Sequence, residues 1–590
     1  MNFKSILAMF IASATLPAWG AVWFVNKGNS SGVEDGTSWQ TAFTQVQAAI
    51  DAAAEDGGGE VWVAQGTYDE TRVSVLDMDF RTDIENLVDT GSVVVKSAVQ
   101  LFGGFAGDEE LRDERNWKTH RTTIDGSVSR GGNAAYHVIV GLDDSVIDGF
   151  SVQGGRADGF IPAGITTGGG IFNTEGRLTI ANCVVENNSS HDSGGGIRAR
   201  GEISVKSCDI RFNSSVDVGG GMFGIGVVTV EDSTFEGNNG SAFRVGADSS
   251  LVTFRRCVFQ FNRPGAILFG VGFAVVEDCK FLSNGGADEG VSAIAITNHE
   301  TRLVNCLFAN NVSANVGGAI LAAGQIIDSE FTTKVAIQNC TFSGNVAGGS
   351  GGAIYFDTVQ SEIQNSVIWG NLPQDVFPVN LDTGYSLIPG GHDGVGNIDA
   401  DPLFVDAANG DLHLQAGSPA IDGGTLEPTS LFSIPPPETD LDGVTRPQGD
   451  GIDMGAYEAL PSGEGEGEGE GEGEGEGEGE TLDEIADSLR SSFAAADTDS
   501  DGQLSFAEAV AAQPDLTAEG FADLDADGDD FVTDAELAAF LDVDGPQCFG
   551  ASGSREGRPI RGAADLVVLV GAMLSILGRR AGPIQRMQRA

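Results

Sequence analysis

One pattern of apolar and polar positions recurs eight times along the chain between residues 183 and 371. Each copy begins with a position that holds a small residue, cysteine or serine, which we call the slot. Two positions after the slot stands an apolar residue, and five positions after it stands asparagine. The slot holds Cys183, Cys208, Ser233, Cys257, Cys279, Cys306, Cys340 and Ser366; the apolar position holds Val185, Ile210, Phe235, Phe259, Phe281, Phe308, Phe342 and Ile368; the third holds Asn188, Asn213, Asn238, Asn262, Asn284, Asn311, Asn345 and Asn371. The copies follow at intervals of 22 to 34 residues, which predicts a solenoid of short parallel strands whose coils differ mainly in their turns.

The spacing within each copy also predicts how the coils stack. Side chains two positions apart on a strand point to the same face, so the slot and the apolar position should both face the interior. Equivalent positions of neighbouring coils are then expected about 4.8 Å apart. Each asparagine is expected to close a turn, in a left-handed conformation that asparagine tolerates, and to hydrogen-bond its counterparts in adjacent coils.

The N-terminus has a different pattern. Residues 1–20 combine a basic start at Lys4, an apolar segment from Ile6 to Leu16, and the small-x-small sequence Ala18-Trp19-Gly20. This order of parts predicts a signal peptide, so we expect a secreted or cell-surface protein.

Six of the seven cysteines occupy the repeated slot. Secreted proteins often pair their cysteines. A disulfide, however, needs Cβ atoms roughly 3.5–4.5 Å apart in a specific torsion, whereas cysteines in neighbouring coils should be a full strand spacing apart. We therefore expect buried free thiols that act as small hydrophobic side chains.

Upstream of the repeat, residues 39–54 show the periodicity of an amphipathic helix. Phe43, Val46 and Ile50 lie on one face, and Thr37 and Gln40 are placed as a capping box. Because the end of a solenoid exposes its core, this helix is expected to cap the first coil.

Four short segments stand out upstream of the repeat: Asp35-Gly36-Thr37-Ser38-Trp39, Gly66-Thr67-Tyr68, Leu101-Phe102-Gly103-Gly104-Phe105 and Val146-Ile147-Asp148-Gly149-Phe150. They resemble segments of pectin-lyase-like, right-handed β-helix proteins of environmental bacteria. A later stretch resembles a choice-of-anchor Q domain, through Asp401-Pro402-Leu403-Phe404, Gly417-Ser418-Pro419-Ala420-Ile421-Asp422, Asp440-Leu441-Asp442-Gly443, Arg446-Pro447 and Asp453-Met454-Gly455-Ala456-Tyr457-Glu458. The resemblance spans residues 22–460 and implies a right-handed fold and attachment to a surface, but not an activity.

Beyond residue 460 the composition changes. Gly463 to Glu480 alternate strictly between glycine and glutamate, which predicts an extended, solvated spacer. Two EF-hand-like calcium loops follow, and their expected Ca²⁺ ligands are Asp497, Asp499, Asp501, Gln503, Ser505 and Glu508 in the first loop and Asp525, Asp527, Asp529, Phe531, Thr533 and Glu536 in the second.

The two calcium loops are not identical. Gly502 permits the sharp turn in the first loop, whereas the second carries Asp530 at that place, so we expect the second site to be weaker. Leu504 and Val532 occupy the positions where paired loops join through a short β-ladder. A dockerin-like duplicate is the alternative, although Glu508 and Glu536 at position 12 of the loops favour an EF-hand pair.

The C-terminal tail, residues 546–590, contains an apolar run from Leu566 to Gly578 followed by Arg579-Arg580. The run is short for a membrane span, which needs about 20 residues. With Cys548 and a polar spacer before it, this order resembles the sorting tails of bacterial surface proteins. We expect sorting or transient membrane association; an ordinary amphipathic terminus is the alternative.

Charge restricts the class of partner. The formal net charge of −54 argues against nucleic acid as a partner, because binding to nucleic acid needs a clustered basic surface.

On the strand after each glycine-rich turn, the outward positions show no pair of carboxylates on adjacent coils, as acid/base hydrolysis of a glycan would require. We therefore assign no catalytic residue. The residues Phe172, Arg198, Phe223, Arg244 and Tyr355 are candidates for contact with a glycan, or for the seat of residues 373–460.

Together these features predict an all-β, right-handed parallel β-helix with an N-terminal capping helix, and a small all-α EF-hand domain. The expected segments are a signal peptide (1–20), the β-helix (21–372), a capping segment (373–460), the linker (461–480), the EF-hand pair (481–545) and the tail (546–590). The first functional hypothesis is a non-catalytic, calcium-binding adhesion or carbohydrate-binding platform whose partner is an extracellular polysaccharide. The second is a secreted polysaccharide lyase or hydrolase that acts on anionic glycans.

Overall fold

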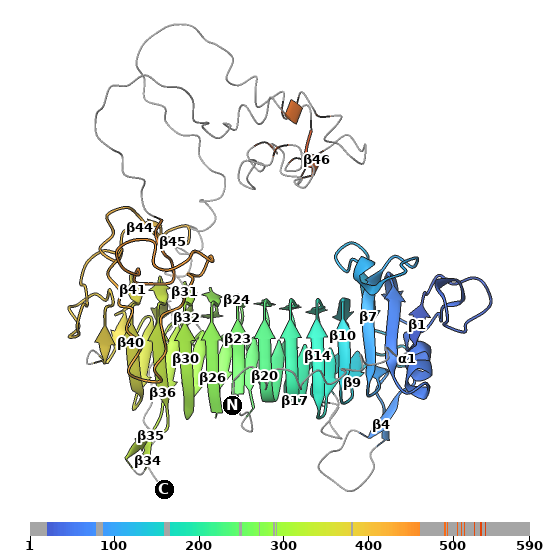
Figure 1. Cartoon of the computed structure of the whole chain (residues 1–590). Coiled ribbons are helices and arrows are strands. Elements are labelled where there is room, and N and C mark those ends of the chain that lie inside the picture. Colours follow the sequence, from blue (N-terminus) through green and yellow to red (C-terminus); the bar gives the residue numbers. More distant parts are fainter. Residues whose placement is uncertain are drawn as a thin grey trace, which may run out of the picture. The chain divides into compact units, whose positions relative to one another are not determined.

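The computed structural model describes residues 21–77, 87–158, 166–246, 251–270, 272–286, 290, 292–327, 329–378 and 381–460, together with residues 489–490, 493, 504–505, 509, 513, 524, 531–533 and 537 (Figure 1). The chain divides into two compact units, residues 1–465 and 466–590, each of which is described by itself. The predicted signal peptide, the Gly-Glu linker and the C-terminal tail lie outside the described residues.

The first unit is a parallel β-helix, as the repeat predicts. Its largest sheet joins, in the described part, β1 (Val22–Val25), β2 (Gly59–Ala64), β6 (Val93–Val95), β7 (Val99–Phe105), β9 (Ile139–Gly141), β10 (Ser145–Asp148), β13 (Ile171–Asn173), β14 (Arg177–Ala181), β17 (Ile197–Lys206), β20 (Met222–Glu231), β22 (Phe243–Val245), β23 (Leu251–Arg255), β25 (Ile267–Phe269), β26 (Gly272–Glu277), β29 (Ile294–Thr297), β30 (His299–Val304), β33 (Ile320–Ala323), β36 (Lys334–Gln338), β39 (Ile354–Asp357), β40 (Gln360–Gln364), β42 (Val376–Phe377) and β43 (Thr383–Gly384).

A second parallel sheet runs along another side of the solenoid. In sheet order it consists of β3 (Gly66–Tyr68), β8 (Thr122–Asp125), β11 (Phe150–Gln153), β15 (Val184–Glu186), β18 (Asp209–Arg211), β21 (Thr234–Glu236), β24 (Val258–Gln260), β27 (Lys280–Leu282), β31 (Leu307–Ala309), β37 (Thr341–Ser343) and β41 (Val367–Trp369). Two shorter parallel sheets join β12 (Arg156–Ala157), β16 (Ser189–Ser190) and β19 (Ser214–Ser215), and β28 (Gly285–Gly286), β32 (Val312–Ser313) and β38 (Val346–Ala347).

The remaining strands form antiparallel pairs: β4 (Val75–Asp77) with β5 (Leu87–Asp89), β34 (Ile326–Ile327) with β35 (Glu330–Phe331), β44 (Phe404–Asp406) with β45 (Asp411–Leu414), and β46 (Leu504–Ser505) with β47 (Phe531–Val532). The parallel pairing of the solenoid continues past residue 372, because β42 pairs with β39 and β43 pairs with β40.

One coil shows how the chain turns. β17 bends at Gly201, whose φ is +121° and whose missing side chain lets the backbone approach the coil before it; a Cβ there would lie 2.0 Å from the carbonyl oxygen of Gly176. Ser207 adopts a left-handed φ of 51° between β17 and β18, and Phe212 does so at 53° between β18 and β19. In this coil, therefore, a one-residue left-handed turn lies on each side of β18.

The predicted interior columns are present. Phe235, Phe259, Phe281, Phe308 and Phe342 are register partners on successive strands, and their ring centroids are stacked 5.0, 4.9, 4.7 and 4.6 Å apart. These separations equal the spacing of strands in a sheet, so equivalent side chains of successive coils lie directly over one another.

The six cysteines of the slot are free and buried, as predicted. The backbone N–H of Cys183 donates to Sγ of Cys208 at 3.5 Å, and the Cys208 thiol lies 3.2 Å from the carbonyl oxygen of Lys206. Burial raises the pKa of the Cys208 thiol, which keeps it protonated and able to donate. Ser233 fills the slot in the next coil and makes the equivalent bond to Glu231 at 2.7 Å.

The asparagines form a continuous ladder. Each Oδ1 accepts hydrogen bonds from the backbone N–H and from Nδ2 of the asparagine one coil earlier, at 2.8–3.2 Å, from Asn188 through to Asn371. The N–H of Gly155 donates to the first Oδ1, and the Asp375 carboxylate accepts both donors of Asn371 at the last. The predicted ladder is confirmed.

The conformation predicted for these asparagines is wrong. The left-handed residue is the one before each ladder asparagine, for example Asn187, Phe212 and Phe261, and not the asparagine itself. The reason is geometric: the turn residue points its side chain outward, whereas the ladder asparagine must direct its amide along the stack inside the coil.

The helix near the N-terminus begins later than the periodicity predicts. Residues Trp39–Thr41 form a short 3-10 turn, η1, for which the Ser38 hydroxyl accepts from the Thr41 N–H, and the α-helix α1 spans Val46–Glu55. The capping box predicted at Thr37 and Gln40 is therefore wrong. Val46, Ala49, Ile50 and Ala53 of α1 are buried in the solenoid core, and α1 packs on β1, β2 and β6. Its role as a cap over the first coil stays a prediction.

Residues 373–460 pack mainly onto the outside of the later coils. Leu412, Ala456 and Tyr457 cover Leu307 and Ala309 of β31. Ala420 and Met454 cover Val367 of β41, and Ile434 covers Val304 and Ala336. In Figure 1 this segment lies over β31 and β41.

Candidate functional site

The candidate glycan-contact residues lie on one column of the main sheet. Arg198, Phe223, Arg244, Leu268, Ala295, Leu321, Tyr355 and Phe377 are register partners on successive strands from β17 to β42. We call this column the outward strip. Its side chains are half-buried apart from Phe377, which is exposed, and the Tyr355 and Phe377 rings are stacked 5.0 Å apart.

Phe172 does not belong to the accessible part of this column, although it is in register with Arg198. Its side chain is completely buried and stacked on His137, with ring centroids 4.5 Å apart. The Arg198 guanidinium lies over the Phe172 ring at 5.3 Å. The prediction that Phe172 contacts a glycan is therefore wrong, because Arg198 and the neighbouring apolar side chains cover it.

The alternative interpretation of the strip, as the seat of residues 373–460, holds only at its end, where Phe377 stacks on Tyr355. Residues 373–460 seat on β31, β37, β41 and the adjoining outer positions of β30 and β36, whereas the outward strip runs along β17, β20, β22, β25, β29, β33 and β39. Among the described residues of that segment, Val376–Phe377 are the ones that pair with the strip, as its last strand. The strip therefore has its own face of the solenoid.

The chemistry of the strip is cationic and aromatic. Partial burial lowers the pKa of the Arg244 guanidinium from its usual value, but such a group keeps its charge at neutral pH. From Arg198 to Phe377 the described strip carries two arginines, three aromatic rings and no carboxylate. This arrangement can stack against sugar rings and pair with acidic groups, but it does not supply the two carboxylates of a glycosidase.

Most of the predicted calcium ligands lie outside the described residues: Asp497, Asp499, Asp501, Gln503, Glu508, Asp525, Asp527, Asp529 and Glu536. Ser505, Phe531 and Thr533 are described. Leu504 pairs with Val532 and Ser505 with Phe531 in the antiparallel ladder β46–β47, which is the pairing that the sequence predicts. Leu489, Leu504, Leu524, Val532 and Leu537 are buried in this unit. Calcium binding itself stays a prediction.

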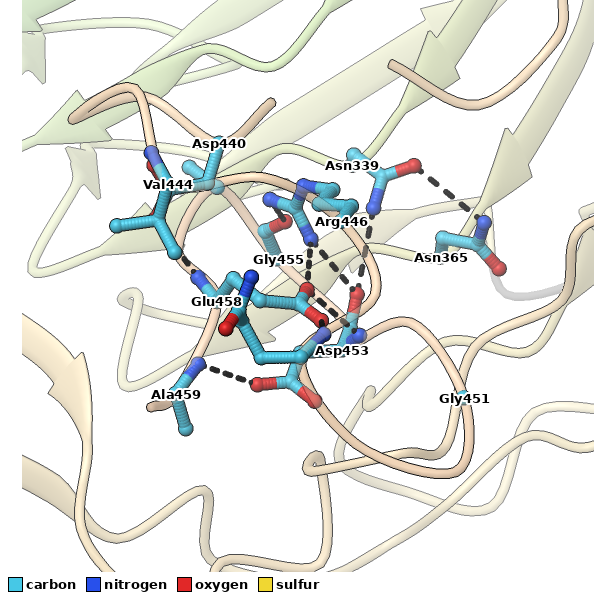
Figure 2. Close-up of polar contacts among 12 residues, drawn as sticks. Asn339, Asn365, Asp440, Val444, Arg446, Gly451, Asp453, Gly455, Glu458 and Ala459 are labelled. Carbon is cyan, nitrogen blue, oxygen red and sulfur yellow. Dashed lines mark hydrogen bonds and ion pairs between the residues drawn. The ribbon is translucent and has the colours of Figure 1, made fainter. Parts of the chain in front are cut away.

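The segment 373–460 contains a buried ion pair that sequence analysis did not single out. Arg446 and Glu458 approach to 2.9 Å with side chains only 1% exposed, and Figure 2 shows them at the centre of a polar network. Arg446 also donates to the carbonyl oxygens of Asp453 and Gly455 and to Asn305 of the solenoid. Glu458 accepts from the N–H groups of Gln448 and Asp453.

Asp440 and Asp453 complete this network through backbone contacts. Asp440 accepts from the N–H groups of Asp442, Val444 and Glu458, and Asp453 accepts from those of Asp422 and Ala459. Burial raises the pKa of Asp453 to about 6. Because these carboxylates are held by backbone donors, the motif residues 440–458 fix the fold of the segment and its attachment to the solenoid.

A charged loop before β8 is a second feature that the sequence alone does not indicate. Arg112, Arg115, Lys118 and Arg121 are four of the 32 Lys and Arg residues in the whole chain, and Trp117 lies among them. The loop borders a groove of about 360 Å³, which is lined by Trp117, Lys118, Arg121, Thr122, Gly149, Phe150, Ser151, Asn182, Cys183, Val184, Ser207 and Asp209. The same loop carries five carboxylates, Asp108, Glu109, Glu110, Asp113 and Glu114, so it has no net positive charge and no charge pattern in the sequence distinguishes it.

Among the described residues, none of the helices has the length and the apolar surface that a membrane span requires. No group of three or more His, Cys, Asp or Glu side chains in the same residues is arranged to hold a metal ion.

Comparison with known proteins identifies the repeat. The family described as "Right handed beta helix region" matches residues 148–311, so this part of the chain is a right-handed β-helix. The Chlamydia polymorphic membrane protein repeat matches residues 305–323 and 339–357, each of which contains one slot cysteine and one ladder asparagine. No curated protein matches the chain.

Solved structures that are similar to the chain include two lyases and an epimerase. Pectate lyase Pel9A is 12% identical over 74% of this chain and 96% of its own, with a TM-score of 0.34. The A-module of the Azotobacter vinelandii mannuronan C-5 epimerase AlgE6 is 15% identical over 60% of this chain and 94% of its own, with a TM-score of 0.34. A rhamnogalacturonan lyase is 13% identical over 67% and 97%, with a TM-score of 0.26.

Proposed function

We propose that the chain is a secreted, cell-surface protein whose β-helix is a non-catalytic platform for adhesion or carbohydrate binding. The observation that carries this proposal is the outward strip, in which Arg198, Phe223, Arg244, Tyr355 and Phe377 follow one line on the sheet. Aromatic faces stack on the apolar faces of sugar rings, and guanidinium groups bind carboxylates. The expected partner is therefore an extracellular polysaccharide with acidic groups.

The regular spacing of the strip supports an extended ligand. Register partners on neighbouring strands are about 4.8 Å apart, so residues two coils apart are separated by roughly 10 Å. Phe223 and Leu268 stand in that relation, with Arg244 between them. A rigid sheet loses little conformational entropy when it binds, which favours a long and repetitive ligand.

Binding and catalysis can be separated in one set of assays on the purified full chain. We expect retention on polyuronate columns and weaker retention on neutral glycans. Arg244→Ala and Phe223→Ala should each weaken retention about tenfold or more if they act as anchors. Arg177→Ala is the matched control, because Arg177 is an exposed arginine on another strand, β14. Equal retention of all three variants and the native chain would contradict the proposal.

The alternative function, lyase or hydrolase activity on anionic glycans, is tested in the same samples. A lyase creates unsaturated ends that absorb ultraviolet light, and a hydrolase creates reducing ends. We expect neither to accumulate above the rate found with the boiled protein. If such ends accumulate with the native chain and not with Arg244→Ala, the protein is an enzyme and not a non-catalytic platform.

Calcium binding by the two EF-hand-like loops is the second part of the proposal. The β46–β47 pairing of Leu504 with Val532 supports it, because paired loops are joined at these positions. Calorimetric titration of the full chain should detect two Ca²⁺ sites, with Glu508→Gln weakening the first and Glu536→Gln the second. Glu519→Gln, between the loops, is the control. Binding that both loop variants leave unchanged would refute the assignment.

Export and anchoring complete the proposal. Residues 1–20 would direct secretion, the Gly-Glu linker would separate the β-helix from the surface, and residues 546–590 would sort the chain or associate with the membrane. The resemblance of residues 401–458 to a choice-of-anchor domain supports attachment to a surface. Fractionation of cells that express the full chain and the chain ended at residue 545 tests this: only the full chain should remain with the cells.

A further inference from the structure

We propose that His413 is a pH-sensitive clamp within the segment 373–460. As an imidazolium it holds the hairpin β44–β45 against the loop that carries Asp442, and on losing its proton it releases the hairpin. We call Asp411, His413 and Asp442 the histidine clamp. It concerns how this segment is attached to the solenoid, so it depends neither on a glycan nor on calcium.

Both ring nitrogens of His413 face a carboxylate. Nδ1 lies 2.6 Å from Oδ1 of Asp411, and Nε2 lies 2.8 Å from Oδ2 of Asp442. A neutral imidazole carries one N–H group and one lone pair, whereas the imidazolium carries two N–H groups. Only the protonated ring can therefore donate to both carboxylates. In either neutral tautomer a lone pair faces one carboxylate, and that contact becomes repulsive.

The clamp connects the hairpin with the loop and with the solenoid. His413 and Asp411 belong to β45, whereas Asp442 lies in a separate loop. The Asp440 carboxylate holds this loop by accepting from the Asp442 N–H at 2.9 Å. The second carboxylate oxygen of Asp442 lies 3.5 Å from Nζ of Lys280, on β27 of the solenoid. The contact between His413 and Asp442 is thus a polar link that runs from the hairpin to the solenoid.

The surroundings of His413 favour a positive ring. A cavity of about 900 Å³ lies beside it, and the described residues that line the cavity include six carboxylates and no lysine or arginine. The carboxylates belong to Asp422, Asp440, Asp442, Asp450, Asp453 and Glu458. The remaining titratable groups around the ring are Asp411 on its own strand, Lys280 on β27, and Tyr457, whose ring centroid is 4.0 Å from that of His413.

These contacts set the direction of the response to pH. Burial lowers the pKa of His413, but the hydrogen bonds and charges of its two carboxylate partners outweigh burial, so the pKa is raised from its usual value of 6.5. The clamp is therefore closed below pH 6.5, and it opens as the pH rises through the folded-state pKa. Asp453, with a pKa of about 6, is mostly ionised in this window and adds to the negative field.

Opening of the clamp affects the apolar surface beneath the hairpin. Leu412, next to His413 on β45, is buried and packs with Tyr457 on Leu307 and Ala309 of β31. Without the contact to Asp442 this packing loses its polar support, so the hairpin lifts from β31 more often. The change is a local opening, which the chain undergoes while the solenoid stays folded.

Hydrogen exchange of the full chain tests the clamp. Amide protection in residues 404–414 is compared at about pH 6 and pH 8.5, after correction for the exchange rate of an unfolded peptide at each pH. We expect protection in the hairpin to fall roughly threefold to tenfold at the higher pH, since one pKa unit corresponds to a tenfold change in an equilibrium constant. Protection in β20 and β23, in the middle of the solenoid, should not fall.

Two substitutions separate the charge of the clamp from its structure. His413→Gln cannot become cationic, so protection in the hairpin should no longer depend on pH. Asp442→Asn keeps an oxygen that can accept from Nε2–H but removes the negative charge, so the midpoint of the pH dependence should move down by about 0.5 unit or more. His191→Gln is the matched control, because His191 is an exposed histidine that pairs with Asp192 at 2.8 Å in the coil of β16. It should leave protection in the hairpin unchanged.

The melting temperature of each variant shows whether the chain is folded. The clamp is overturned if protection in the native hairpin is equal at both pH values, if folded His413→Gln keeps the native pH dependence, or if Asp442→Asn leaves the midpoint where it is. Should His413→Gln fail to fold, the native pH dependence and the Asp442→Asn midpoint still decide the question.

Discussion

Asn238 has all its hydrogen-bonding groups filled from neighbouring coils. Its Oδ1 accepts from the backbone N–H and Nδ2 of Asn213 at 3.1 and 3.2 Å, and its own Nδ2 donates to the Ile210 carbonyl at 2.7 Å and to Asn262 at 3.0 Å. Only asparagine provides one acceptor and two donors at this length, so aspartate would put a buried charge next to two carbonyl-type oxygens. This explains why the same side chain recurs in eight coils.

Removal of one ladder amide should therefore be costly. Asn238→Ala removes the acceptor of the Asn213 backbone N–H and of one Nδ2 hydrogen of Asn213, and it removes a donor to Asn262; each buried unsatisfied group costs about 1–3 kcal/mol. We expect the free energy of unfolding to fall by about 3 kcal/mol or more in urea denaturation. Asn239→Ala is the matched control, because Asn239 is the neighbouring residue and is exposed; it should change stability by less than about 0.5 kcal/mol. Similar losses in both variants would contradict the ladder's contribution.

For single residues, the sequence predicts which side chains face the interior of the solenoid better than it predicts their backbone conformation. The spacing of cysteine, phenylalanine and asparagine is enough to place three columns inside the solenoid, because strand alternation and coil stacking leave little choice. It does not show which residue of the turn is left-handed: Phe212 and Phe261, both poorly suited to that conformation, adopt it. Nor does it show that Phe172, on an outward position, is buried beneath Arg198, since that burial depends on side chains from other strands.

The segment 373–460 is held to the solenoid by few regular elements. In the described part of the segment, β42 and β43 join the main sheet, Leu387 bridges to Val367 of β41, and β44–β45 forms a small hairpin. Apolar contacts and the hydrogen bonds around Arg446 therefore provide much of the attachment. Arg446 reaches Asn305, and Asn339 and Asn365 of the solenoid donate to the carbonyl oxygens of Asp453 and Thr425. The polar network thus connects the segment to three successive coils.

Disruption of the ion pair should loosen this attachment. Arg446→Ala leaves Glu458 buried without its partner, which typically costs about 3–5 kcal/mol. We expect earlier unfolding in urea and faster proteolysis within residues 400–460, with new binding of a hydrophobic dye to the uncovered β31 and β41. Arg177→Ala, which removes an exposed ion pair of 3.3 Å, is the control and should change neither measurement. Unchanged proteolysis of folded Arg446→Ala would show that apolar packing alone attaches the segment.

Elements outside the repeat are the ones that sequence pattern describes least well. The position of α1 is shifted because Ala42 to Gln45 are used to connect η1 with α1, although Phe43 fits the helical periodicity. The face of the solenoid on which residues 373–460 pack could not be predicted from sequence, because the outward strip and β31 both carry outward apolar side chains. The loop before β8 could not be predicted as part of a groove, because it belongs to no repeat and only the folded chain brings Trp117 close to Ser207 and Asp209.

Over the whole molecule, protonation acts on stability in two opposite directions. His137 and His299 are buried in the solenoid, and burial lowers the pKa of each to about 4. As the pH falls below 6.5, the unfolded chain takes up these protons and the folded chain does not, so stability is lost until about pH 4. For Asp453, burial raises the pKa to about 6 from 3.8; the folded chain then takes up the proton first, and stability is gained over that range.

The histidine contribution can be isolated from the remaining charges. His137→Asn keeps a donor for the Gly168 carbonyl oxygen, which His137 Nδ1 contacts at 2.7 Å, and His299→Asn keeps one for Thr301. One pKa unit corresponds to about 1.4 kcal/mol, so each substitution should reduce the loss of unfolding free energy between pH 7 and pH 4.5 by about 2–3 kcal/mol. Urea denaturation at the two pH values measures this difference.

Acid also reduces the negative charge of a chain whose net charge is −54, and so relieves charge repulsion. This effect is the same in the native chain and in the variants, so it cancels in the comparison. His191→Asn, at an exposed position, is the control and should leave the pH dependence nearly unchanged; equal pH dependence of the native chain and both buried variants would mean that the two imidazoles are protonated inside the fold.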